Sequence, residues 1–234
     1  MPAALTNNDR KFWQPRGDVQ AWLMRTIPAD ARVLDVGPGT APFQRADVSI
    51  DWRKPEGVPE SKFRQIDIQR DRLPFEDNSF DFVYCRHVLE DLYDPFSVCA
   101  EMSRVGKAGY VETPSPLAEV CSGIDGNSPP WRGYHHHRFV IWTSGDVLCF
   151  LSKYPVIEYA RIQDEDAVVA SLREGPRFWN SHFLWCDRIN FRFFQHEVDY
   201  WITQGYSRMV NRAIAECRSS STTFESQIAD AQSR

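Results

Sequence analysis

The sequence has few of the features that would anchor a chain in a membrane, cross-link it with disulfides or bind it to nucleic acid. It contains no run of about 18 apolar residues, the length that a membrane-spanning helix needs. Its six cysteines are scattered without C-x-x-C spacing, which argues against a zinc ribbon and a disulfide scaffold. It has no long basic run, and its formal net charge is −5. We therefore expect no membrane partner and no nucleic-acid partner.

The first residues also lack the apolar segment of a secretory signal peptide. With the scattered cysteines, this favours a cytoplasmic protein with reduced thiols. A length of 234 residues suits one α/β domain with some additions.

Apolar patterning in the first half predicts strands that alternate with helices. Residues 18–27 have apolar side chains at helical spacing, with Asp18 as the expected N-cap and Pro28 after the end. Short apolar runs predict strands at 32–36, 48–51, 64–68, 81–85 and 109–112, with a second helix at 95–105. This alternation is typical of a parallel sheet with right-handed crossovers. The first two strands are so close in sequence that any helix between them must be very short.

The second half is patterned differently. Aromatic and β-branched runs around Gly145 predict a β-hairpin over residues 137–153. The remaining expectations are a loop at 121–133, a strand at 156–159, a helix at 164–172 and an aromatic segment at 183–194 that fits either a strand or a helix.

These elements predict an α/β fold: a Rossmann-like, mostly parallel sheet with helices on both faces, plus a C-terminal cap with a β-hairpin. We expect one domain over residues 1–217, with a cofactor-binding core at about 18–116 and an acceptor-side cap at about 117–217. The polar residues 218–234 are expected to form a disordered tail.

Aromatic residues are dense between Phe178 and Trp201. Most of them are expected to be core residues, and the alternatives are a wall of an acceptor pocket or the face of a homodimer.

The segment most informative about function is a glycine loop that follows the first strand. Gly37 and Gly39 form a G-x-G turn, which lets the backbone approach a ligand without Cβ clashes. Asp35 precedes the loop, Asp51 ends the second strand and Asp67 ends the third. A carboxylate at the end of the second strand can accept hydrogen bonds from both hydroxyls of a ribose. The third glycine of a dinucleotide-binding motif is missing.

The segments VLDVGPGT, VSID, QIDI and LPFEDNSFDFVYCRHVLEDL, with a helix ending in EMSRV, resemble the class I S-adenosylmethionine-dependent methyltransferases of the methyltransferase type 11 kind. The resemblance covers roughly residues 30–116 and includes GYVETPSP. It implies S-adenosylmethionine as the cofactor. It does not extend to the residues that would select the methyl acceptor.

The resemblance implies a role for each matching residue. Gly37 and Gly39 would line the methionine and ribose portions of the cofactor, and Asp35 would help hold its amino end. Asp51, with Trp52 beside it, would bind the ribose hydroxyls. The remaining cofactor contacts would come from Asp67 and Ile68 at the adenine, and from Arg86 and His87 at the methionine end near the methyl group.

The sequence departs from the family pattern at two positions. The family usually has His in place of Asp91, and Gly-Gly in place of Ala108-Gly109. Neither position is expected to contact the cofactor.

Histidines are the candidate catalytic bases. His87 is the first, and the triplet His135, His136 and His137 is the second. In an extended segment His135 and His137 would share one face, so these two join His87 as catalytic candidates. The sequence leaves open whether the triplet is catalytic, metal-binding or structural, and we assign no metal site from it.

The predicted function is transfer of a methyl group from S-adenosylmethionine to a small-molecule or sugar-like acceptor, on oxygen or nitrogen. The alternatives are a non-catalytic subunit that binds the same cofactor and a nucleotide-dependent enzyme on a Rossmann sheet. The missing third glycine disfavours the latter, because a pyrophosphate needs a helix N-terminus at that place.

Overall fold

The computed structural model describes residues 14–125, 131–194 and 202–232. Its helices are α1 (Gly17–Thr26), α2 (Pro95–Val105), α3 (Pro116–Val120), α4 (Glu165–Glu174) and α5 (Ile202–Gln232). Short 3-10 helices are η3 (Glu60–Lys62), η4 (Val156–Tyr159) and η5 (Pro176–Phe178). The strands are β1 (Val33–Val36), β2 (Val48–Asp51), β3 (Phe63–Gln65), β4 (Phe82–Arg86), β5 (Ala108–Pro114), β6 (Phe139–Ser144), β7 (Val147–Ser152), β8 (Asn180–Cys186) and β9 (Phe191–Phe194).

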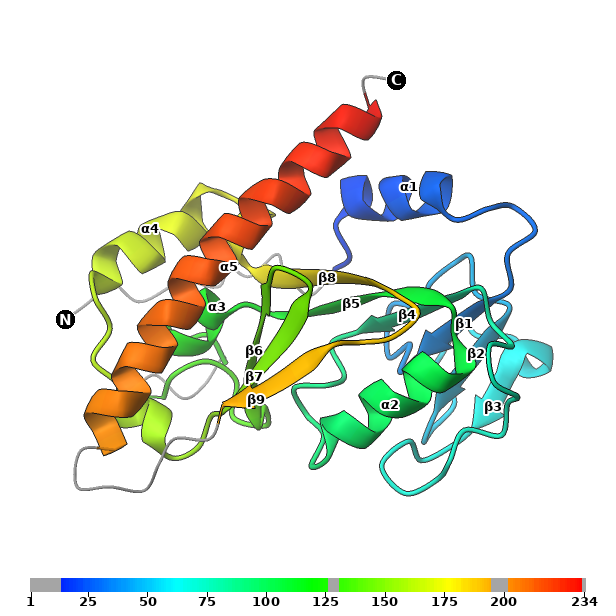
Figure 1. The fold of residues 1–234 in the computed structure, drawn as a ribbon, viewed down its shortest axis with the longest axis horizontal. Coiled ribbons are helices and arrows are strands. Elements are labelled where there is room, and N and C mark those ends of the chain that lie inside the picture. The colour runs from blue at the N-terminus through cyan, green and yellow to red at the C-terminus, as the bar shows by residue number, and fades with distance from the viewer. Residues whose placement is uncertain (1–13, 126–130, 195–201, 233–234) are drawn as a thin grey trace.

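The central sheet has six strands in the order β3-β2-β1-β4-β5-β8 (Figure 1). All neighbours are parallel except β8, which pairs antiparallel with β5. The register places Leu34 opposite Val48 on one side and Val83 on the other. The carboxyl ends of β1 to β5 therefore lie along one edge of the sheet, where ligands bind in such folds.

Helices cover both faces of this sheet, as predicted. Figure 1 shows α1 and α2 on opposite sides of the strands. On one face, Val19 and Leu23 of α1 pack with Tyr84 and Tyr110. On the other face, Met102 of α2 packs among buried side chains of the strands. Alternate residues of each strand point to opposite faces. Because helices cover both faces, the side chains on both faces are buried.

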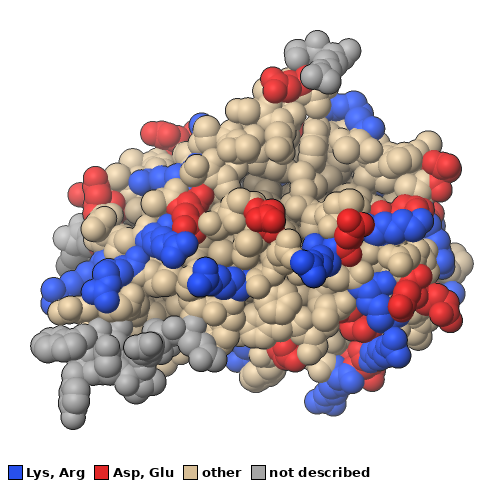
Figure 2. All heavy atoms as spheres, viewed as in Figure 1, with Lys and Arg blue, Asp and Glu red and all other residues tan. Residues whose placement is uncertain are grey.

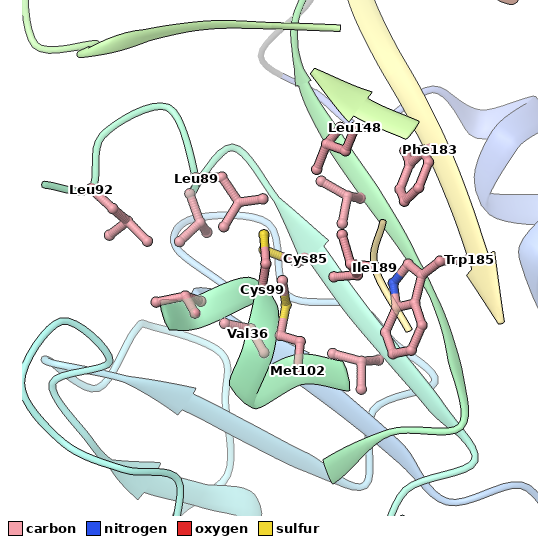
Figure 3. Packing of buried hydrophobic residues seen from close by; sticks show 14 of the residues in the cluster. Val36, Cys85, Leu89, Leu92, Cys99, Met102, Leu148, Phe183, Trp185 and Ile189 are labelled. Atoms are coloured by element: carbon pink, nitrogen blue, oxygen red, sulfur yellow. The ribbon is translucent and has the colours of Figure 1, made fainter. Parts of the chain in front are cut away.

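The residues at the start of helix α2 form a strong capping signal. Asp94 accepts hydrogen bonds from the backbone N–H groups of Phe96 and Ser97, and Pro95 occupies the first turn. Figure 3 shows Cys99 and Met102 of this helix packed near Cys85 of β4 and Trp185 of β8.

For α1 the predicted N-cap is wrong: Arg16 is the N-cap, and Asp18 lies in the first turn.

Residues 37–47, all of them described, form turns and no helix between β1 and β2. The sequence predicted a very short helix at most. A dinucleotide-binding fold would place a helix N-terminus directly after the glycine loop.

The cap contains the predicted hairpin. Strands β6 and β7 pair antiparallel, and Gly145 has a φ of +62° in the turn between them. Strand β9 adds to β7 in parallel, which completes a second, three-stranded sheet. Side chains from β6 and β7, among them Ile141 and Phe150, reach the core that α2 shares with the central sheet.

Three expectations about secondary structure are corrected, and one open alternative is resolved. The strand at 64–68 ends at Gln65, and residues 156–159 form η4 rather than a strand. The aromatic segment at 183–194, which fitted either a strand or a helix, contributes to β8 and forms β9. Residues 218–232 are helical rather than disordered, because Phe224 and Ile228 are buried against the α1 face of the sheet.

No helix among the described residues is long and apolar enough to cross a membrane. Figure 2 shows acidic and basic side chains intermixed over the face in view.

Candidate functional site

The glycine loop after β1 has the conformation that the sequence predicts. Gly37 has a φ of +67° and Gly39 a φ of +49°, both in the left-handed region that favours glycine. A Cβ atom on Gly37 would lie 2.4 Å from Cγ2 of Val88. The N–H of Gly37 donates to the carbonyl of Ile50 at 2.9 Å. Only glycine lets the loop pass this close to the segment after β4.

Two acidic side chains lie at the same edge of the sheet as this loop. Asp51 is the last residue of β2, and Asp67 follows β3 by two residues. Both are partly buried. Asp67 accepts a hydrogen bond from the N–H of Gln69 at 3.1 Å, and Asp51 accepts a long one from the N–H of Arg53 at 3.4 Å. Each of the two carboxylates can still accept further hydrogen bonds in addition to these local contacts.

A cavity of about 390 Å³ opens between the loop and these strand ends. Its lining comprises Gly37, Gly39, Ile50, Asp51, Trp52, Asp67, Ile68, Gln69, His87, Val88, Asp91 and Leu92. Of the nine residues that the family resemblance assigns to the cofactor, the cavity brings together all but Asp35 and Arg86.

Asp35 lies beneath the loop instead of lining the cavity. Its side chain is 1% exposed and accepts a hydrogen bond from the N–H of Phe43 at 2.9 Å. Burial raises the pKa of this carboxyl to about 7, although the Phe43 N–H lowers it, and the nearby Asp51 adds to the rise. Asp35 therefore ties β1 to the turn at Phe43.

Arg86 also turns away from the cavity. Its Nε donates to Oε1 of Glu112 at 2.8 Å; Glu112 is buried and Arg86 partly buried. Burial raises the pKa of Glu112, but contacts with His87 and Arg86 outweigh burial and hold this pKa well below its usual value. Tyr110 donates to the other oxygen of Glu112 at 2.5 Å. Arg86 therefore anchors the end of β4 to β5.

His87 lines the cavity in a strained backbone conformation. Its φ of +52° is uncommon for a residue with a side chain. The N–H of His87 donates to the carbonyl of Glu112 at 2.8 Å, which holds the turn against β5. Strain of this kind is concentrated at functional sites.

The His87 imidazole lies between two buried carboxyl groups. Nδ1 is 3.4 Å from Oε1 of Glu90, and Nε2 is 3.5 Å from Oε1 of Glu112. Burial lowers the pKa of His87, although Glu112 opposes the shift. The ring is therefore neutral near pH 7 and able to accept a proton.

The histidine triplet is divided by a turn, so the expected face shared by His135 and His137 is wrong. Residues 135 and 136 form a turn, and the N–H of His137 donates to the carbonyl of Tyr134. His135 is partly exposed, with Nδ1 3.0 Å from Asp125, and it does not line the cavity. His136 and His137 instead converge on Asp91.

His137 is buried next to the cavity wall. Its side chain is 3% exposed, and its Nδ1 lies 2.5 Å from Oε1 of Glu119. Its Nε2 lies 3.8 Å from Oδ1 of Asp91, which lines the cavity. Asp91 thus lines the cavity, although its position was not expected to contact the cofactor.

The sequence interpretation missed four buried charged residues near the cavity: Glu90, Glu112, Glu119 and Lys153. Glu119 and Lys153 form an ion pair at 2.5 Å. One sequence feature could have revealed them: a charged residue that lies within or at the end of an apolar segment, as in HVLEDL and VLCFLSK. Charged side chains are rarely buried without a partner, so such positions predict either exposure or pairing.

The chain matches the family described as "Methyltransferase domain" over residues 17–111. Among solved structures, the YcgJ protein of Bacillus subtilis is 23% identical over 43% of this chain and 52% of its own, with a TM-score of 0.36. An S-adenosylmethionine-dependent methyltransferase of Mesorhizobium loti is 18% identical over 44% of this chain and 56% of its own, with a TM-score of 0.34.

The match to each of these two proteins thus spans little more than half of their length. No curated protein matches the chain. The family match covers the glycine loop, Asp51, Asp67 and His87, and it ends within β5. Residues 17–111 are therefore similar to a methyltransferase domain.

Proposed function

We propose that the protein transfers a methyl group from S-adenosylmethionine to a small-molecule or sugar-like acceptor. The observation that carries the proposal is the convergence of Gly37, Asp51 and Asp67 on one cavity at the carboxyl ends of parallel strands. The turns of residues 37–47 offer no helix N-terminus for a pyrophosphate, which argues against a dinucleotide.

The cofactor would lie along the strand ends, with its parts recognised separately. Asp51 would accept hydrogen bonds from the ribose hydroxyls, and Trp52, which is 65% exposed, would cover them. Asp67 and Ile68 would hold the adenine. Gly37 and Gly39 would allow the backbone to contact the methionine portion, whose sulfonium end would point toward His87.

Methyl transfer is an in-line displacement at the sulfonium. The acceptor atom forms a bond to the methyl carbon, the carbon–sulfur bond breaks, and its electron pair remains on sulfur. Correct alignment of the reactants supplies about 7–11 kcal/mol. A hydroxyl acceptor also loses a proton, and the neutral imidazole of His87 is the group at the cavity best suited to take it.

A thermal-shift panel tests the choice of cofactor. S-adenosylmethionine and S-adenosylhomocysteine, each at about 100 times its dissociation constant, are expected to stabilise the protein by about 2.7 kcal/mol. NAD and ATP at the same concentrations are expected to leave the melting temperature unchanged. Stabilisation by NAD or ATP alone would reject the proposal in favour of a nucleotide-dependent enzyme.

A further inference from the structure

We propose that Asp91, His136 and His137 bind a divalent transition-metal cation at the wall of the cofactor cavity. One ligand atom from each of the three side chains lies within 4.8 Å of the others. Asp91 contributes Oδ1, which is 3.8 Å from Nε2 of His136 and 3.8 Å from Nε2 of His137. The sequence left open whether the histidine triplet binds a metal, and no metal site was assigned from it.

The two 3.8 Å separations suit a shared cation better than direct hydrogen bonds. They exceed the length of a nitrogen–oxygen hydrogen bond, which is about 2.7–3.2 Å. A zinc-like cation lies about 2.0–2.2 Å from each nitrogen and oxygen ligand. Two ligands at that distance from one cation can therefore be 3.8 Å apart. Oδ1 of Asp91 is also buried and accepts no hydrogen bond from any described residue.

His137 is held in the orientation that metal binding requires. Its Nδ1 lies 2.5 Å from Oε1 of Glu119, which is 1% exposed. A carboxylate at Nδ1 fixes the proton there, so Nε2 carries the lone pair and faces Asp91. A carboxylate behind a histidine ligand is the arrangement that orients histidines in metal sites.

The fold also fixes Glu119. Its second oxygen lies 2.5 Å from Nζ of Lys153, which is fully buried and also donates to the carbonyl of Tyr134. Gly133 has a φ of +59°, and a Cβ atom there would lie 2.3 Å from Oε2 of Glu119. The loop that carries the histidines can therefore close over Glu119 only with glycine at position 133.

Two imidazoles and one carboxylate favour Zn²⁺, Co²⁺, Ni²⁺ or Fe²⁺ over Mg²⁺ and Ca²⁺, which prefer oxygen ligands. Three protein ligands leave at least one coordination position open. Asp91 and His87 both line the cavity, so a cation bound to Asp91 would lie at the wall of the space that His87 also faces.

This placement narrows the acceptor class, in a step that rests on the proposed function. An acceptor hydroxyl bound to the cation would lose its proton more readily, and His87 would take that proton. The alkoxide would then attack the methyl carbon, and the electron pair of the carbon–sulfur bond would remain on sulfur. The acceptor would thus be an alcohol or phenol, preferably with a second oxygen that can also bind the cation.

Metal binding is tested on chelator-treated full-length protein without a polyhistidine tag. Calorimetric titration with Zn²⁺ and visible absorption after Co²⁺ addition are expected to give about one bound ion per chain. His136→Ala is the informative variant because this side chain is 55% exposed, so its removal should leave the fold intact. It is expected to weaken Zn²⁺ binding by at least about tenfold and to change the Co²⁺ spectrum.

His135→Ala is the matched control, because His135 pairs with Asp125 outside the cluster. It is expected to bind Zn²⁺ and Co²⁺ like the wild type. Wild-type protein that binds no Zn²⁺, or equal Zn²⁺ affinity in His136→Ala, would overturn the proposal. S-adenosylhomocysteine affinity, measured without metal on the same samples, reports on the proposed function separately and is expected to be the same in all three proteins.

Discussion

At the scale of single residues, the region beside the cavity contains three buried glutamates with different surroundings. Glu90, Glu112 and Glu119 are each 1% exposed. Glu112 pairs with Arg86, and Glu119 pairs with Lys153. Neither oxygen of Glu90 has a hydrogen-bond partner among the described residues. Burial raises the pKa of Glu90 well above its usual value, with further contributions from Asp91 and Glu119. Glu90 is therefore the one of the three that remains protonated.

The raised pKa of Glu90 makes a prediction about pH dependence. In the folded state Glu90 stays protonated above pH 4.5, whereas in the unfolded state it ionises. Its contribution to stability is thus fully present at low pH and is lost as pH rises, by up to about 1.4 kcal/mol per pH unit. The isosteric Glu90→Gln variant has no ionisable group at this position, so it does not lose this stability as pH rises. The difference in unfolding free energy, variant minus wild type, should therefore increase between pH 5 and pH 8.

Urea unfolding at both pH values measures this difference. The exposed Glu76→Gln variant is the control and should follow the pH dependence of the wild type. Parallel pH dependences for Glu90→Gln and wild type would show that Glu90 ionises in the folded protein.

The residues of the candidate site were predictable to different degrees. Gly37, Gly39, Asp51 and Asp67 were found because each lies at or shortly after a strand end, and parallel strands bring their ends to one edge. The partners of His137 were not predictable from the sequence. Glu119, which contacts His137, lies in α3, and Lys153, which pairs with Glu119, follows β7; only the packing of the cap brings these segments together.

At the scale of secondary structure, the predictions succeeded where local signals were complete. Helix α2 has an Asp N-cap and a first-turn proline, and the β6–β7 hairpin has a glycine where φ is positive. Strands β8 and β9 remained ambiguous because their assignment depends on pairing with β5 and β7, which are distant in sequence. Aromatic residues alone do not distinguish a strand from a buried helix.

The C-terminal part of α5 is the largest correction at this scale. Its polar composition suggested disorder, yet Cys217, Ser221, Phe224 and Ile228 are all buried. Their spacing of three and four residues places them on one face of a helix. The sequence contained this stripe, but serine and cysteine at two of its positions concealed it.

Phe224 provides the test of that stripe. Its ring stacks on His182 with centroids 4.2 Å apart and meets Trp22 of α1 edge-on at 5.6 Å. Phe224→Ala is expected to lower the unfolding free energy by about 3–5 kcal/mol, the usual cost of removing a buried phenyl ring. The measurement is chemical denaturation, with the exposed neighbour Thr223→Ala as the control. Equal stability of the two variants would mean that this end of α5 is not packed in solution.

At the scale of the whole molecule, two parts contribute to one site. The region that matches the methyltransferase family supplies the glycine loop, the acidic strand ends and His87. The region after β5 supplies His136, His137, Glu119 and Lys153 next to the same cavity. The resemblance to a known family ends before this second region, so the sequence predicted the cofactor half of the site and left the acceptor half open. The homodimer, one of the alternatives offered for the aromatic segment, is untested by the structure.

The central claim is that the cavity binds S-adenosylmethionine through Asp51, and calorimetric titration with S-adenosylhomocysteine tests it most directly. Wild-type protein is expected to bind one molecule per chain. Asp51→Ala should weaken binding by about 1.5–3 kcal/mol, the value of hydrogen bonds to a charged group, and Asp30→Ala, at an exposed turn, should leave it unchanged. Unchanged affinity in a folded Asp51→Ala variant, or no binding by the wild type, would contradict the claim.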